Sequence, residues 1–136
     1  DQDFRSVSHP NIFACGNSVH VFDLVDYCSK SGEIAGKAAA NDIIEQSFID
    51  VNPGNLIRYV VPNKINFNAA LNNVMFNFRS IDDYSSKVLR IKQGNTTILE
   101  KPLKEIKCAE CQKYNIDLTN FALSRSLPII VSLEDK

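Results

Sequence analysis

The sequence lacks an excess of charge of either sign. Its 15 lysines and arginines are balanced by 16 aspartates and glutamates, and the formal net charge is −1. Proteins that follow a phosphate backbone carry a patch or stripe of basic residues, and no stretch of this chain is basic enough to form one. We therefore expect no nucleic-acid partner.

Long apolar runs are also absent. None approaches the roughly 20 residues that a membrane-spanning helix needs, and no secretory signal peptide is recognisable. The chain opens on Asp1 without an initiator methionine, within sequence typical of the middle of an element. We therefore expect no membrane span, and we interpret the chain as a fragment or processed product.

Cysteine is scarce, with 4 residues at Cys15, Cys28, Cys108 and Cys111. A chain of 136 residues can bury a core without disulfides, so a reducing, cytoplasmic compartment is the simpler expectation. Cys108 and Cys111 form a C-x-x-C pair, but a second pair for zinc is missing, and so is the helix N-terminus that activates redox thiols. We interpret them as loop or strand-edge cysteines and expect no metal; metal binding and redox chemistry are the less favoured alternatives.

The chain divides into two parts with different patterns. Residues 1–50 indicate a short strand, a turn and a long helix, whereas residues 55–136 indicate strands and turns only. Residues 51–55, which include Pro53 and Gly54, predict a turn-rich joint between them. The predicted fold class is α+β, with a strand–turn–helix unit followed by an all-β sandwich of about seven strands.

In the first part, residues 11–15 form a short apolar run that ends at Gly16 and Asn17, which predicts a buried parallel strand. A helix is predicted from about residue 23 to about residue 46. Gly32 and Gly36 lie in this helix and indicate close packing against another backbone, because glycine is costly in a helix interior. The predicted apolar face consists of Leu24, Cys28, Ala35, Ala39 and Ile43.

In the second part, alternation and turn residues predict a series of short strands. Gly94 and Asn95 indicate a tight hairpin between two of them. Val74, Phe76 and Phe78 alternate with polar residues and so predict one apolar face. The strands are predicted at residues 56–61, 73–79, 87–92, 96–100, 114–119 and 128–133.

Three segments in fixed order resemble the last FAD-contacting part of the pyridine nucleotide-disulfide oxidoreductase family. They are residues 8–17 (SHPNIFACGN), 23–26 (DLVD) and 32–40 (GEIAGKAAA). The Cys-Gly-Asn and Asp-Leu-Val-Asp variants are most similar to the subgroup described as NAD(FAD)-dependent dehydrogenases. The resemblance is strong up to residue 40 and looser beyond, where that subgroup also carries a β-rich tail.

The resemblance implies four cofactor-binding residues for FAD. Gly16 would let the backbone approach the cofactor closely, and Asn17, where the commoner motif has aspartate, would accept a hydrogen bond from a ribityl hydroxyl. Leu24 and Val25 would supply backbone contacts at the flavin ring. The following helix would direct its N-terminal N–H groups at the flavin and stabilise negative charge on its reduced form.

The implied function is that of the C-terminal portion of a flavoprotein that moves electrons between NAD(P)H and an unnamed acceptor through FAD. The 5 glycines never form the G-x-G-x-x-G turn that seats a dinucleotide. We therefore expect the fragment to be inactive and to need the other FAD- and NAD-binding domains as partners, and we assign no catalytic residue. The alternative is a non-enzymatic β-sandwich module for interaction or dimerisation, including a homo-oligomer.

Two further residues have competing interpretations. His20 follows the glycine turn and could transfer protons near the flavin, but a partly exposed loop histidine is the simpler interpretation. Asp23 lies at the predicted helix start, where its charge suits the helix dipole. Because the predicted apolar helix face needs cover, we also expect the helix to pack on its own sandwich or on another copy of the chain.

Overall fold

The computed structural model describes residues 1–41 and 45–136. Within these residues the chain has one α-helix, one short 3-10 helix and eight strands in two sheets, which confirms an α+β class. The elements are η1 (Gly16–Ser18), α1 (Val25–Ala39), β1 (Phe48–Pro53), β2 (Ile57–Val61), β3 (Lys64–Asn66), β4 (Val74–Ser80), β5 (Tyr84–Gln93), β6 (Thr96–Ile106), β7 (Gln112–Ile116) and β8 (Ile129–Asp135).

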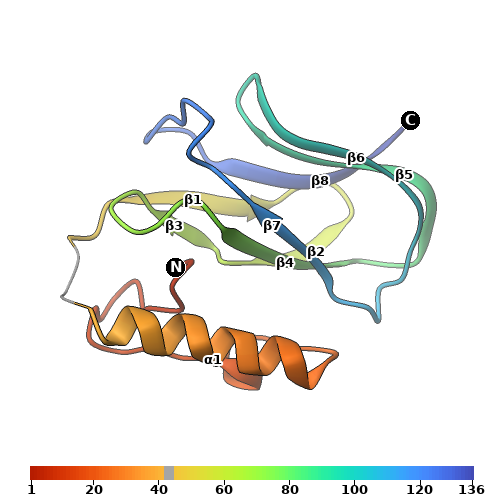
Figure 1. Ribbon diagram of the computed structural model, residues 1–136. Helices are drawn as coiled ribbons and strands as arrows, with labels where there is room; N and C mark the ends of the chain where they lie inside the picture. The colour runs from red at the N-terminus through yellow and green to blue at the C-terminus, as the bar shows by residue number, and fades with distance from the viewer. Residues whose placement is uncertain (42–44) are drawn as a thin grey trace.

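The strands form a five-stranded sheet in the order β3-β1-β8-β5-β6 and a three-stranded sheet in the order β2-β4-β7. All pairings are antiparallel except that between β1 and β8, which is parallel. The sheets pack face to face on a shared apolar core, and α1 lies at the bottom of the view, far from β5, β6 and β8 (Figure 1). The predicted sandwich is therefore confirmed, with one strand more than expected.

The centre of the core is the inner face of β4. Val74, Phe76 and Phe78 are all at most 1% exposed, which confirms the predicted apolar face. Opposing residues of the five-stranded sheet, such as Leu89 and Ile91, are equally buried. Each large apolar side chain removed from water contributes about 1.5–3 kcal/mol. This core keeps the sandwich rigid behind the N-terminal residues.

The outer face of β4 is also covered. Met75 packs with Phe4, Phe22 and Ala35 in a second apolar cluster, which joins the N-terminal residues and α1 to the three-stranded sheet. The helix therefore packs on its own sandwich, the first of the two coverings expected. Asn77 on the same face is completely buried.

Two strands were not predicted, and one turn was placed too early. β3 is short, and β1 continues through residues 51–53, which the sequence had assigned to a joint; the turn begins only at Gly54. Val51 aligns with Ile129 in the parallel pairing with β8. Such a partner lies at the other end of the chain, so local turn signals gave the wrong assignment. The predicted hairpin at Gly94 is confirmed between β5 and β6.

The predicted strand at residues 11–15 is wrong for this chain. Among the described residues it forms only a single bridge, between Phe13 and Arg5. Ile12 and Cys15 are exposed, not buried. A parallel strand needs neighbours along its length to satisfy its backbone groups, and the described residues place no strand beside this segment.

The helix is shorter than predicted. α1 ends at Ala39, and its final carbonyls are satisfied by side chains: Asn41 Nδ2 donates to the Lys37 carbonyl at 3.0 Å, and the Arg5 guanidinium donates to the Ala38 carbonyl at 3.2 Å. The predicted position Ile43 lies outside the described residues. The buried helix positions are Ser31, Ala35 and Ala38, so the buried face keeps the predicted Ala35 but is shifted around the helix, with Leu24 and Ala39 exposed.

The helix glycines meet little in this chain. A Cβ on Gly36 would have no described atom outside its own helix within 4 Å, and one on Gly32 would reach only Cys15 Sγ, at 4.0 Å. The close backbone approach predicted from these glycines is therefore not made among the described residues. Gly54 is different, because a Cβ there would lie 2.7 Å from Ile130 Cγ2.

Substitution of these glycines by alanine should have opposite effects. Gly54→Ala should lower the free energy of unfolding by about 1–3 kcal/mol, because the new methyl group overpacks against β8. Gly36→Ala should raise it by about 0.5–1 kcal/mol, because alanine is the better helix residue and has room. Urea denaturation of the 136-residue chain measures both. Equal midpoints for the two variants would contradict the packing described here.

Candidate functional site

Gly16 begins the turn on which the predicted cofactor site depends. Its φ of +61° is in the left-handed region, which glycine adopts without strain. Its N–H donates to Ser31 Oγ at 2.8 Å, so the turn is fixed to the middle of α1. A Cβ at Gly16 would meet nothing within 4 Å. This position therefore requires the left-handed backbone conformation, and the space beside its backbone is open.

Asn17 holds the loop that follows. Its Oδ1 accepts a hydrogen bond from Phe22 N at 3.2 Å and lies 3.4 Å from the Cys28 thiol. The oxygen predicted to accept from a ribityl hydroxyl therefore already has two partners within the chain. Asn17 is nevertheless exposed, and its hydrogen bonds fix where the loop between η1 and α1 returns to the helix.

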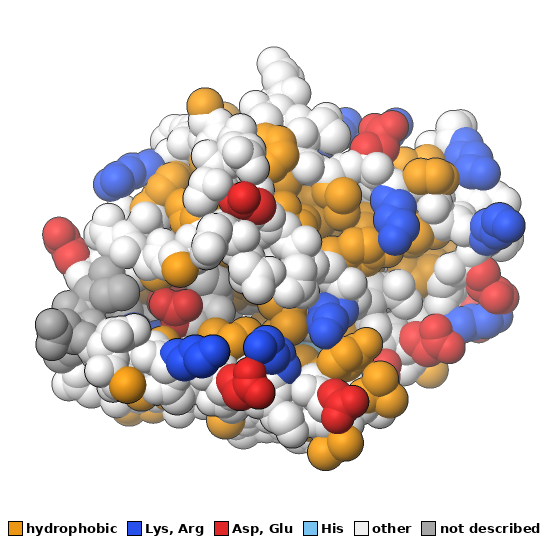
Figure 2. Space-filling model, in the orientation of Figure 1, with side chains coloured by type: hydrophobic (Ala, Val, Ile, Leu, Met, Phe, Trp, Pro, Cys, Tyr) orange, Lys and Arg blue, Asp and Glu red, His pale blue; other side chains and the backbone are white. Residues whose placement is uncertain are grey.

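The N-terminal end of α1 is exposed and has no side-chain cap. Leu24 is the N-cap residue, and its side chain makes no capping hydrogen bond. Leu24 is 54% exposed and Val25 is 76% exposed. Ile12 and Val21 are exposed as well, so four of the six large apolar residues exposed in the described chain lie within residues 12–25. Figure 2 shows hydrophobic side chains at the lower right, where α1 begins in Figure 1.

We call Val21, Leu24 and Val25, which flank the N-terminal end of α1, the apolar collar. Together with Gly16 and Asn17 it brings all four predicted cofactor-binding residues to one region, between η1 and the start of α1. Free N–H groups and the positive end of the helix dipole favour a partially negative group at this helix end. The apolar side chains around it favour a ligand or partner with an apolar surface.

Asp23 does not serve the helix dipole as predicted. Its Oδ1 forms an ion pair with Arg79 Nη2 at 2.5 Å, and its Oδ2 accepts a hydrogen bond from Cys111 N. Burial alone would raise the pKa of Asp23, but these hydrogen bonds outweigh it and lower the pKa. The acidic residue inside the first turn is Asp26 instead.

Arg79 joins the N-terminal residues to two strands of the sandwich. Its Nε donates to Tyr59 Oη at 3.0 Å, and its Nη2 donates to the Val21 carbonyl at 2.9 Å. A further hydrogen bond from Nη1 reaches the Ala109 carbonyl. Only 14% of the Arg79 side chain is exposed. We call Arg79, Asp23, Cys111, His20 and Tyr59 the polar ring, because in this order each member contacts the next and Tyr59 contacts Arg79 again.

His20 lies between Tyr59 and Cys111 in the polar ring. Its Nδ1 lies 3.0 Å from Tyr59 Oη and its Nε2 lies 3.5 Å from Cys111 Sγ. Because the Tyr59 oxygen accepts from Arg79, its own proton is free to go to His20 Nδ1. That tautomer places a proton on Nε2, facing Cys111 Sγ, while the thiol donates to the Gln112 carbonyl at 3.6 Å. At 7% exposed, His20 is more deeply buried than the loop histidine expected.

The surroundings of the polar ring disfavour ionisation of its thiol and its imidazole. Burial raises the pKa of the Cys111 thiol to about 11, so the reactive thiolate is disfavoured. Burial and the nearby Arg79 cation both lower the pKa of His20, against a smaller opposing effect of Asp23. A neutral thiol beside a neutral imidazole does not form the ion pair that activates a cysteine nucleophile.

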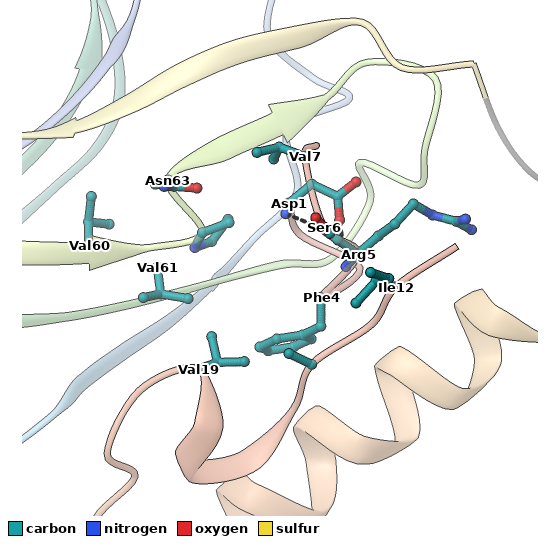
Figure 3. A pocket seen from close by; sticks show the side chains of 12 residues that line it. Asp1, Phe4, Arg5, Ser6, Val7, Ile12, Val19, Val60, Val61 and Asn63 are labelled. Atoms are coloured by element: carbon teal, nitrogen blue, oxygen red, sulfur yellow. Dashed lines mark hydrogen bonds between the residues drawn. The ribbon is translucent and has the colours of Figure 1, made fainter. Parts of the chain in front are cut away.

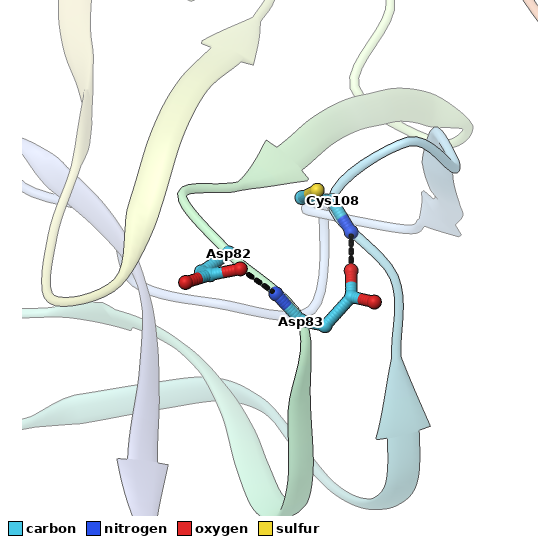
Figure 4. Close-up of side chains that lie close together, drawn as sticks. All are labelled: Asp82, Asp83 and Cys108. Carbon is cyan, nitrogen blue, oxygen red and sulfur yellow. Dashed lines mark hydrogen bonds between the residues drawn. The ribbon is translucent and has the colours of Figure 1, made fainter.

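The other cysteine of the C-x-x-C pair points elsewhere. Cys108 Sγ and the carboxylates of Asp82 and Asp83 have ligand atoms within 4.8 Å of one another, on the turns after β4 and β6 (Figure 4). Cys108 N donates to Asp83 Oδ1 at 2.8 Å, and Lys107 Nζ lies 3.5 Å from Asp83 Oδ2. Structural zinc takes four ligands in a closed shell. The group of Asp82, Asp83 and Cys108 offers only three ligands. The ammonium group of Lys107 competes for Asp83.

Hollows lie between the N-terminal part of the chain and the three-stranded sheet. One, of about 360 Å³, lies between the first residues and β2, with Phe4, Val19 and Val61 around it (Figure 3). Another, of about 660 Å³, lies between α1 and the β4 and β7 strands. Neither is lined by Gly16, Asn17, Leu24 or Val25. The predicted cofactor residues thus lie on an open surface of this chain.

Protonation of His20 should weaken the fold. At high pH the imidazole is neutral in both folded and unfolded chains. As the pH falls through its ordinary pKa of 6.5, the unfolded chain binds a proton that the folded chain disfavours, so the free energy of unfolding decreases. Chemical denaturation from about pH 8 to about pH 5 measures how steeply the free energy of unfolding decreases as the pH falls. This decrease should be smaller in His20→Gln. His9→Gln, at an exposed histidine, controls for the loss of an imidazole, and an unchanged slope in His20→Gln would contradict the prediction.

Comparison with known proteins identifies no relative: no family model matches the chain, and no curated protein or solved structure matches it. Among the described residues, no helix is long and apolar enough to cross a membrane.

Proposed function

We propose that this chain is the C-terminal portion of an FAD-dependent NAD(P)H oxidoreductase, a dehydrogenase of the pyridine nucleotide-disulfide oxidoreductase family. The observation that carries the proposal is the exposed, uncapped start of α1, flanked by the apolar collar, with the left-handed Gly16 turn bonded to the same helix at Ser31. The sequence motif and the geometry of this region support the same ligand. The cytoplasm is the compartment that we propose for the enzyme.

The residues fit FAD in polarity. The amphipathic isoalloxazine has apolar faces, which suit exposed Leu24 and Val25, and a polar pyrimidine edge, which suits uncapped N–H groups. Gly16 has open space beside its backbone, so a phosphate or sugar group meets no side chain there. When bound, FAD supplies the electron-transfer chemistry between NAD(P)H and the acceptor. The chain's own residues would hold the cofactor and stabilise negative charge near the helix start.

Asn17 has a modified role in this proposal. Because its Oδ1 already fixes the loop through Phe22 and Cys28, we assign it chiefly to shaping the cofactor surface. A ribityl hydroxyl can still bond to the exposed amide, which offers two N–H donors besides the oxygen. The hydrogen bond to the cofactor would then run from protein to hydroxyl, opposite to the direction expected from the family motif.

Two uncovered features support partners in the same protein. The Gly36 side of α1 has free space, and residues 11–15 pair only with residues 4–6, through the single Arg5–Phe13 bridge, among the described residues. A sheet of the FAD-binding domain would fill both, by accepting residues 11–15 as a strand and packing on the glycine face. The other FAD- and NAD-binding domains are therefore the partners that we propose.

The rival function is a non-enzymatic interaction or dimerisation module. The apolar collar would then be buried against a second copy of the chain, because exposed apolar surface of this kind favours association. The two functions differ in what covers the collar. FAD binding requires the whole oxidoreductase, whereas self-association requires only these 136 residues.

Spectroscopy of the intact gene product separates the two functions. The proposal expects a yellow protein with flavin absorbance that NADH or NADPH bleaches, and a colourless 136-residue chain under the same FAD concentration. A colourless intact protein, together with light scattering that shows a dimer of the 136-residue chain, would support the interaction module instead.

Gly16→Ala in the intact protein should weaken FAD binding by about tenfold. A non-glycine residue in the left-handed region costs about 1–2 kcal/mol, and relief of that strain would move the backbone next to the cofactor. Gly94→Ala is the matched control, because Gly94 also has a positive φ (+55°) but lies in the distant β5–β6 hairpin. Equilibrium titration with FAD measures both variants, and equal losses would contradict a cofactor role for Gly16.

A further inference from the structure

We propose that Arg79 is a positioning residue that fixes the start of α1 to the β-sandwich and keeps the Asp23 carboxylate away from the helix N-terminus. Its effect on a cofactor rests on the proposed function, whereas its effect on the chain does not. The sandwich then holds the cofactor-facing loop in place, in addition to burying its own core.

The first step is the number of segments that Arg79 contacts. Its guanidinium donates to the Val21 carbonyl and to Asp23 on the N-terminal side. On the sandwich side it donates to Tyr59 of β2 and to the Ala109 carbonyl before β7. A planar guanidinium offers five N–H donors in a rigid fork, so one side chain can fix these segments in one geometry.

The second step is that two positions of the sandwich hold one carboxylate. Asp23 Oδ1 is held by Arg79 at the end of β4, and Oδ2 by Cys111 N just before β7. Asp23 immediately precedes Leu24, the N-cap residue of α1. With both oxygens engaged, the carboxylate cannot turn toward the helix N–H groups.

The third step concerns charge at the helix start. A carboxylate near a helix N-terminus is stabilised there and occupies the positive potential. Release of Asp23 would let it compete with any anionic or partially negative ligand at that position. Arg79 therefore contributes to the site without touching the ligand, by leaving the N–H groups next to Leu24 and Val25 free.

Hydrogen exchange on the 136-residue chain tests the clamp. Arg79→Gln should increase amide exchange of residues 21–26 at least tenfold over the wild-type chain, while amides in β5 and β8 keep their protection. Arg79→Lys, which keeps the charge but loses the fork, should give an intermediate increase. Arg90→Gln is the matched control, because Arg90 is likewise an ion-paired arginine, but its partners Glu100 and Glu134 lie within the five-stranded sheet. Equal exchange of residues 21–26 in Arg79→Gln and Arg90→Gln would overturn the clamp.

The intact flavoprotein tests the electrostatic part. Arg79→Gln should make the flavin reduction potential more negative, because the released Asp23 carboxylate destabilises the reduced, negatively charged flavin. Asp23→Asn breaks the same ion pair but leaves the Arg79 cation without its carboxylate, so it should not make the potential more negative. Equal shifts in the two variants would show that Arg79 only stiffens the loop and would overturn the charge argument.

The two measurements fail independently. If the intact protein binds no flavin, the proposed function is wrong, and hydrogen exchange alone decides whether Arg79 fixes residues 21–26. If Arg79→Gln increases exchange but FAD affinity and potential stay at wild-type values, the clamp is confirmed and its role at the cofactor site is overturned.

Discussion

One guanidinium group, beside the apolar cluster of Met75, joins the segment before α1 to the sandwich. The core of the sandwich is complete without Arg79, since Phe76, Phe78 and their neighbours bury one another regardless of what covers the outer face. Arg79 determines where residues 20–25 lie relative to that face. An isolated surface ion pair contributes only about 0–1 kcal/mol. Arg79 is more than a pair, because it is largely buried and donates to acceptors in several segments, so its contribution lies mainly in geometry.

Sequence patterns predicted the parts of the fold that depend on near neighbours. The alternation around Phe76 and the turn at Gly94 can each be recognised from neighbouring residues alone, because a strand face and a two-residue hairpin are local properties. β1 depends on β8 from the other end of the chain, and its last residues contain a proline that locally indicates a turn. Residues 11–15 show the converse: the run is typical of a buried strand, but burial requires neighbours that the described residues do not provide.

The candidate site divides in the same way. Gly16 and Asn17 are recognisable because a glycine turn and its amide act within a short segment. The polar ring is not, since Asp23 lies 56 residues from Arg79, and His20 lies 91 residues from Cys111. Each residue has a plausible interpretation from its neighbours in sequence. For Asp23 this interpretation is an interaction with the helix dipole, which contributes about 0.3–1 kcal/mol. Two charge-assisted hydrogen bonds from the sandwich are stronger than this interaction.

The two sides of α1 show why the proposed function requires more than this chain. One side carries Ala35 and packs with Met75 of β4, held in place by contacts among the described residues. The other carries Gly36, where glycine costs about 1 kcal/mol relative to alanine and, within the described chain, gains no contact. Selection for stability of these residues alone would favour alanine at that position. A glycine in the last turn of α1 is accounted for if a second backbone occupies that side of the helix in the proposed oxidoreductase.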